Sequence, residues 1–150
     1  MQSLFDQSSR SEIISRINKL TADAKPQWGK MNSAQMLAHC TVGLKTATGE
    51  LKVKRAFIGR LLGGYAKKKF LIKDEPFGKN SPTGTHLIVK DDRNFDDEKS
   101  KLIAIIEKFG NAGASGVNSE PHTFFGELTP ELWDKLMAKH IEHHLVQFGV

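Results

Sequence analysis

The sequence contains only one cysteine, Cys40, so an internal disulfide framework is excluded. No run of apolar residues approaches the length of a membrane span. The first residues lack the basic start and apolar run of a secretory signal. Strand-like alternation is also scarce along the chain. These absences predict a cytoplasmic protein without a membrane partner, and its length fits one domain over residues 1–150.

Acidic residues are missing from the segment Leu51–Lys73, which carries eight basic residues and a charge of +8. The rest of the chain has the remaining 14 basic residues against 17 acidic ones, so the basic character is local. Such a segment can attract an anionic small molecule, a nucleic acid or a membrane surface, or it can be a solvated face without a partner. Nucleic-acid binding is the less favoured interpretation, because the segment has few aromatics and no recognised motif. The candidate contacts to an anionic substrate are Lys52, Arg55, Arg60 and Lys67.

Four segments have strong helix signals, each with a capping residue followed by apolar residues at helical spacing. The predicted caps are, in chain order, Ser9, Asn32, Asn94 and Thr129. Ser9 forms a capping-box pattern with Glu12, and the third helix is expected to stop at Gly110. The chain is therefore expected to be all-α, a bundle of helices.

Weaker signals lie between these helices. Ala56–Lys69 is predicted to be helical although three glycines interrupt it. Thr85–Lys90 is expected to form a short extended segment. The glycine-rich residues 110–127 are expected to form a surface loop.

Half of the six histidines fall in the sequence HIEHHL of the last predicted helix. Because each helical residue advances by about 100°, His140 and His144 project from the middle of its apolar face, one turn apart. His143 lies at the edge of that face, and Glu142 lies on the opposite side. A buried imidazole must form a hydrogen bond or bind a ligand, since an unpaired buried polar group costs roughly 1–3 kcal/mol. The pair is thus either two hydrogen-bonded core histidines or half of a metal site.

A third ligand can come from His39 on the second predicted helix. Three histidines on two helices would leave coordination positions for water or substrate. The residues expected to surround this site are His143, Trp28 and Trp133. The sequence nominates no catalytic residue.

Two stretches resemble a known family: WGKMNSAQMLAHC (Trp28–Cys40) and HTFFGELTPELWDKLMAKHIEHHLVQFG (His122–Gly149). Both are similar to the DinB/YfiT-like superfamily of metalloenzymes, and more narrowly to an uncharacterised subfamily of it. The resemblance implies a four-helix bundle with a long crossover connection. It also implies a metal held by one histidine of the second helix and two of the last, which match His39, His140 and His144. Many relatives continue from the histidine pair into Arg-Gly-Gln, whereas this chain keeps only the glutamine, Gln147.

The resemblance further implies a divalent metal, with Zn²⁺ or Ni²⁺ expected, and a low-molecular-weight thiol as a second cofactor. The expected activity is that of a metal-dependent thiol transferase or hydrolase acting on a small, anionic substrate. A homodimer is also consistent with the resemblance. The alternative hypotheses are a non-catalytic module that senses a metal or small ligand, and nucleic-acid binding through residues 52–73.

Overall fold

The computed structural model describes residues 2–150, and the regular secondary structure of these residues is helical. Its α-helices are α1 (Gln7–Lys19), α2 (Ser33–Ala47), α3 (Phe57–Lys67), α4 (Phe95–Ala112) and α5 (Pro130–Gln147). Three short helices join them: the π-helix η1 (Lys68–Ile72) and the 3-10 helices η2 (Thr85–Leu87) and η3 (Gly113–Gly116). Residues 2–150 include no β-strand, which confirms the all-α class. No helix in this range has the length and apolar character needed to cross a membrane.

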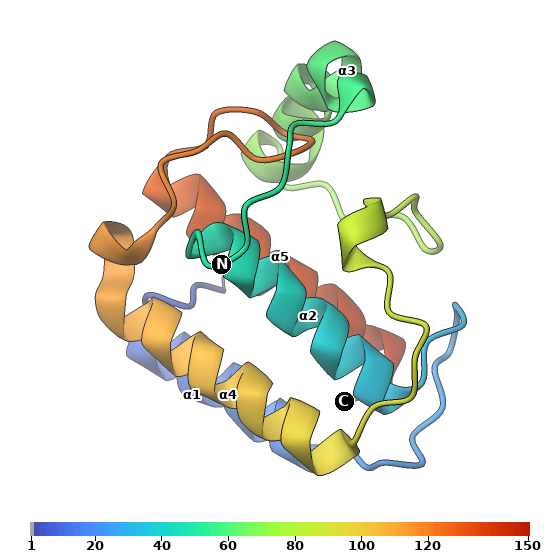
Figure 1. Cartoon of the computed structure of the whole chain (residues 1–150). Coiled ribbons are helices and arrows are strands. Elements are labelled where there is room, and N and C mark those ends of the chain that lie inside the picture. The colour runs from blue at the N-terminus through green and yellow to red at the C-terminus, as the bar shows by residue number, and fades with distance from the viewer. Residues whose placement is uncertain (1) are drawn as a thin grey trace.

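Two pairs of long helices enclose the core. Helix α2 packs against α4 and α5, and α1 also packs against both of them (Figure 1). Helices α2 and α5 lie side by side and run in opposite directions. The largest side chains buried between the helices include Ile13, Leu37, Leu44, Leu102, Ile106, Phe109 and Trp133.

Three of the four predicted helix caps are confirmed. Asn32, Asn94 and Thr129 each accept a hydrogen bond from the backbone of their own first turn. The predicted cap at Ser9 is wrong, because α1 begins earlier and Asp6 accepts from the Ser9 backbone N–H. The Ser9 hydroxyl accepts instead from the backbone of Ser3, which ties the N-terminal segment to α1.

The predicted stop at Gly110 is also wrong, by three residues. Gly110 stays helical, and α4 continues until Gly113 adopts a φ of 58°. A side chain at Gly110 would collide with Arg10 and the Leu4 carbonyl, so this glycine permits close packing against the N-terminal segment. The residues that follow form η3 before the chain enters an irregular loop.

The segment between α2 and α4 departs from expectation at one place. The predicted extended segment at Thr85–Lys90 is instead the 3-10 turn η2 followed by irregular chain. The predicted helix at Ala56–Lys69 is confirmed as α3, and η1 prolongs it. Gly59 and Gly63 lie against the backbone of Phe124, where any side chain would collide, so two of the three glycines that weakened the prediction are required for packing.

Helix α3 lies at one end of the molecule, away from α1 and α4 (Figure 1). Its glycine face contacts the loop before α5, and its other face leaves large apolar side chains exposed. These exposed residues are Phe57, Ile58, Leu61, Leu62 and Tyr65.

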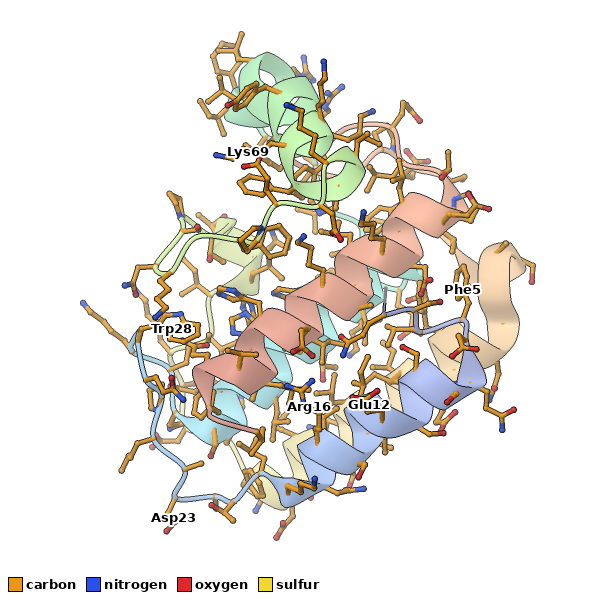
Figure 2. The ribbon with its side chains drawn as sticks, turned by 180° about the vertical axis from the view of Figure 1, so that it is seen from behind. Phe5, Glu12, Arg16, Asp23, Trp28 and Lys69 are labelled. Carbon is orange, nitrogen blue, oxygen red and sulfur yellow. The ribbon has the colours of Figure 1, made fainter. Side chains whose placement is uncertain are left out.

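Helix α5 is fixed to the N-terminal segment and to α1 by polar contacts. The buried carboxylate of Asp134 accepts from the backbone N–H groups of Leu4, at 2.7 Å, and Phe5, at 3.2 Å. The side chain of Arg16, a residue of α1, extends towards α5 (Figure 2). It pairs with Glu142 and donates to the backbone carbonyl of Val150. These contacts hold α5, which carries half of the six histidines, at both ends.

Replacing Asp134 with Ala should lower the free energy of unfolding by roughly 1–3 kcal/mol, because it leaves buried backbone donors without an acceptor. Urea unfolding measures this difference. The exposed Asp92, replaced in the same way, should change stability by less than about 0.5 kcal/mol. Equal effects of the two substitutions would contradict the role assigned to Asp134.

Candidate metal centre

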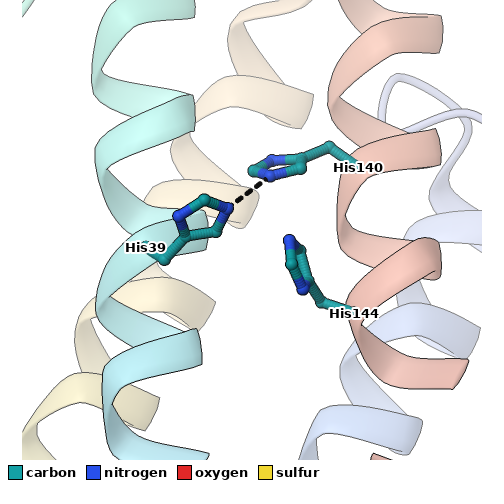
Figure 3. A group of neighbouring side chains, drawn as sticks. All are labelled: His39, His140 and His144. Atoms are coloured by element: carbon teal, nitrogen blue, oxygen red, sulfur yellow. Dashed lines mark hydrogen bonds between the residues drawn. The ribbon is translucent and has the colours of Figure 1, made fainter. Parts of the chain in front are cut away.

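Three histidine side chains meet in the space between α2 and α5. His39 comes from the middle of α2, and His140 and His144 come from successive turns of α5 (Figure 3). One ring nitrogen of each residue lies within 4.8 Å of those of the other two. The residues His39 and His144 are buried, and His140 is partly exposed. The cluster could hold a metal ion.

Hydrogen bonding fixes the protonation of the His39 ring. Its Nδ1 lies 2.8 Å from the carbonyl oxygen of Leu87 in η2. A carbonyl can only accept, so Nδ1 carries the proton and Nε2 keeps a lone pair in the neutral ring. That Nε2 lies 2.8 Å from Nε2 of His140, which must therefore be the donor between the two rings.

The His144 ring is oriented in the same way by Gln147. Its Nδ1 lies 2.7 Å from Oε1 of Gln147, whose own Nε2 donates to the Trp28 carbonyl at 2.6 Å. Because the Trp28 carbonyl can only accept, the amide nitrogen of Gln147 faces Trp28 and the amide oxygen faces His144. Nδ1 of His144 is therefore the donor to that oxygen, and Nε2 of His144 keeps a lone pair. Gly29, with a φ of 83°, lets the chain pass close to Gln147 where a Cβ would collide.

The cluster therefore has the partners that metal-binding histidines usually have. Such ligands donate their second ring N–H to a carbonyl or another acceptor, which fixes the tautomer and the orientation of the ring. The Leu87 carbonyl does this for His39, and the Gln147 amide does it for His144. Both rings offer an unprotonated Nε2 before any ion binds.

Burial keeps these rings neutral. Desolvation lowers the pKa of His144 to about 3 and, with the nearby His39, outweighs the opposing hydrogen bond to Gln147. The pKa of His140 lies well below its usual value for the same main reason, reinforced by the other histidines. The pKa of His39 is also lowered by burial, although the Leu87 carbonyl opposes that shift. Neutral imidazoles are the form that binds metals.

The neighbouring residues do not join the cluster. His143 is half-buried, and its ring lies between those of Trp28, at 5.5 Å, and Phe77, at 6.0 Å. Cys40 is buried, and burial raises the pKa of its thiol, so it packs as an apolar residue. Trp133 is buried two turns before His140 on α5, beside His122 at 5.1 Å between ring centroids.

The four candidate substrate contacts divide into two groups. Lys52 and Arg55 line a cavity of about 470 Å³, together with Trp133. Arg60 and Lys67 belong to α3 and do not line it. The Lys67 ammonium donates instead to the Glu127 carbonyl at 3.0 Å.

Three residues of this site, Leu87, Gln147 and Gly43, had no role predicted from the sequence. The Leu87 carbonyl gives no residue-specific signal, and Leu87 lies in the segment expected to be extended. Gln147 could have been found, because it lies three residues after His144 and thus on the same side of the helix. Gly43, one turn after His39, leaves room for the His140 ring, since an added Cβ would lie 3.2 Å from its Nδ1.

The low pKa of His144 predicts that chelator-treated protein loses stability in acid. In the unfolded chain the His144 ring has its ordinary pKa near 6.5 and binds a proton below that pH. In the folded protein the same ring binds the proton only near pH 3. The contribution of neutral His144 to the free energy of unfolding is therefore fully present above about pH 6.5. Below that pH, the free energy of unfolding falls by about 1.4 kcal/mol per pH unit because of His144. Urea unfolding between about pH 7 and pH 5 measures this loss, which His144→Gln should reduce. A free energy of unfolding that stays constant over this range would contradict the prediction.

The comparisons with known proteins give one family. No curated protein and no solved structure matches the chain. A family model described as "Protein of unknown function (DUF1569)" matches residues 3–149, which is nearly the whole sequence. The chain belongs to the DUF1569 family.

Proposed function

We propose that this protein binds a divalent metal ion through His39, His140 and His144 and uses it for catalysis. The observation that carries the proposal is the convergence of three ring nitrogens within 4.8 Å. Two of the rings are already held with an unprotonated Nε2, and that of His39 accepts from His140 until an ion binds. A shared ion would take a nitrogen of all three rings as ligands together.

We further propose that the fold is the DinB/YfiT-like four-helix bundle. Helices α1, α2, α4 and α5 would be its four members, and their mutual packing supports this assignment. The connection from α2 to α4, which includes α3, would be the long crossover. The placement of one histidine on α2 and two on α5 agrees with what the resemblance implies for the ligands.

The donor set favours Zn²⁺ or Ni²⁺. Imidazole suits both ions, and the cluster among the described residues includes no carboxylate or thiolate. Three protein ligands would leave a position for water or a low-molecular-weight thiol. An ion held by these three histidines would lower the pKa of a coordinated water or thiol and would supply a nucleophile at neutral pH.

The surrounding residues would orient the ligands. Leu87 and Gln147 hold two of the rings by their Nδ1 protons. His140 is the ring that must change tautomer, because its Nε2 proton is donated to His39 in the absence of an ion. Glu142 pairs with Arg16 of α1, so it does not serve as the base.

The alternative function is a metal or small-ligand sensor without turnover. It is favoured by the absence of a carboxylate from the cluster in residues 2–150, since hydrolytic sites often use one as a general base. Turnover of thiol-transfer and hydrolysis substrates by the metal-loaded protein would distinguish the enzyme from the sensor.

The metal content of protein purified without a histidine tag tests the proposal. We expect near-stoichiometric Zn²⁺ or Ni²⁺ in the parent and its loss in His39→Ala and His144→Ala. His143→Ala is the matched control, because this ring packs against Trp28, Phe77 and His144 but contributes no nitrogen to the cluster, and the variant should keep most of the metal. Equal loss from His143→Ala and His144→Ala would refute the ligand assignment.

Gln147→Leu should weaken metal binding by roughly 10–100-fold, because the His144 ring loses the acceptor that orients it. Gln147→Glu keeps an acceptor and should retain more of the affinity. Val146→Ala is the control, since Val146 is exposed on the same turn of α5 and should leave the affinity unchanged. Competition with a chromogenic chelator measures these affinities. Unchanged binding by Gln147→Leu would show that the amide does not orient a ligand.

A further inference from the structure

The cavity of about 470 Å³ is lined by none of the three clustered histidines and is not explained by metal binding. Its volume falls within the range of small-molecule sites, roughly 300–1,000 Å³. Thr46 of α2 and Trp133 of α5 both line it, and each lies seven residues along its helix from His39 and His140 respectively. Seven helical residues span about 10 Å, so a small molecule in the cavity can reach towards the histidines.

The walls of this cavity are held by backbone hydrogen bonds. The Ala56 N–H donates to the Thr123 carbonyl at 2.9 Å, which joins the basic segment to the loop before α5. The same loop is tied to the end of α2, where Asn118 donates its backbone N–H to the Ala47 carbonyl at 2.7 Å and its side-chain amide to the Thr46 carbonyl at 3.1 Å. The cavity is thus built from three chain segments that are fixed to one another.

The charged groups of the cavity favour an anion. Lys52, Lys54 and Arg55 line it, and Glu120 is the one acidic residue that does so; three positive charges against one negative charge leave +2. None of the three cations forms an ion pair with any residue from 2 to 150. Their charges therefore remain available to a ligand.

The cavity also has hydrogen-bond donors without acceptors. Trp133 is only 1% exposed, and its indole N–H has no partner among the described residues. Such a buried donor costs stability unless something accepts from it. His122 adds a second donor: its Nδ1 accepts from the backbone N–H groups of Phe124 and Phe125, at 3.0 and 3.1 Å. The proton of the neutral ring is therefore on Nε2, which has no acceptor within residues 2–150.

We propose that this cavity binds the carboxylate group of a small organic anion. The charges of Lys52 and Arg55 attract the carboxylate, and the N–H groups of Trp133 and His122 donate to its oxygens. The role of the bound molecule rests on the proposed function, since this molecule would be the substrate presented to the metal. Its binding, however, depends on different residues from those that hold the metal.

Benzoate is the probe, and isothermal titration calorimetry of the full chain measures its binding. Benzamide has the same shape without the charge, and we expect it to bind at least about tenfold more weakly. Lys52→Gln, Arg55→Gln and Trp133→Phe should each weaken benzoate binding by about tenfold. Arg60→Gln is the matched control, because it removes one charge of the same basic segment outside the cavity and should change the affinity by less than about twofold.

The proposal is overturned if benzamide binds as tightly as benzoate, if Arg60→Gln weakens binding as much as Arg55→Gln, or if benzoate does not bind. A folded Trp133→Phe protein, verified by circular dichroism, that binds benzoate like the parent would also overturn it. The same titration on His144→Ala separates the two proposals. Benzoate binding that persists in this variant supports the anion site whether or not the parent binds metal, and metal binding without benzoate binding refutes the anion site alone.

Discussion

The burial of three neutral imidazoles between α2 and α5 is the constraint on which the site depends. Burial removes the rings from water and lowers the pKa of each. Each ring nitrogen must then find a partner inside the protein. The Leu87 carbonyl and the Gln147 amide satisfy the outer nitrogens of two rings. The nitrogens that remain are directed at one another, and a shared cation would satisfy them.

The irregular parts of the chain make this arrangement possible. The 3-10 turn η2 brings the Leu87 carbonyl to α2, and the tight turn at Gly29 brings the Trp28 carbonyl to Gln147. The helices position the rings, whereas these loops select their tautomers. A similar division holds in the neighbouring cavity, where α5 supplies Trp133 and the loop before it supplies His122. The two sites therefore share α5 as a rigid support.

Helical periodicity made part of this site predictable. Because residues four apart lie on one face of a helix, His140 and His144 could be paired from the sequence alone. His39 could be nominated, but its distance from them depends on how α2 packs against α5. The acceptor at Leu87 could not be predicted, since a backbone carbonyl is common to every residue. Likewise, the separation of Arg55 from Arg60 depends on where the loop ends and α3 begins.

The central claim is that one ion is shared by histidines from α2 and α5. Crystals of the protein loaded with one equivalent of Zn²⁺, measured at the zinc absorption edge, test it most directly. We expect a single anomalous peak about 2.0–2.1 Å from a ring nitrogen of each of His39, His140 and His144. A peak elsewhere, with the His39–His140 hydrogen bond still in place, would contradict the account.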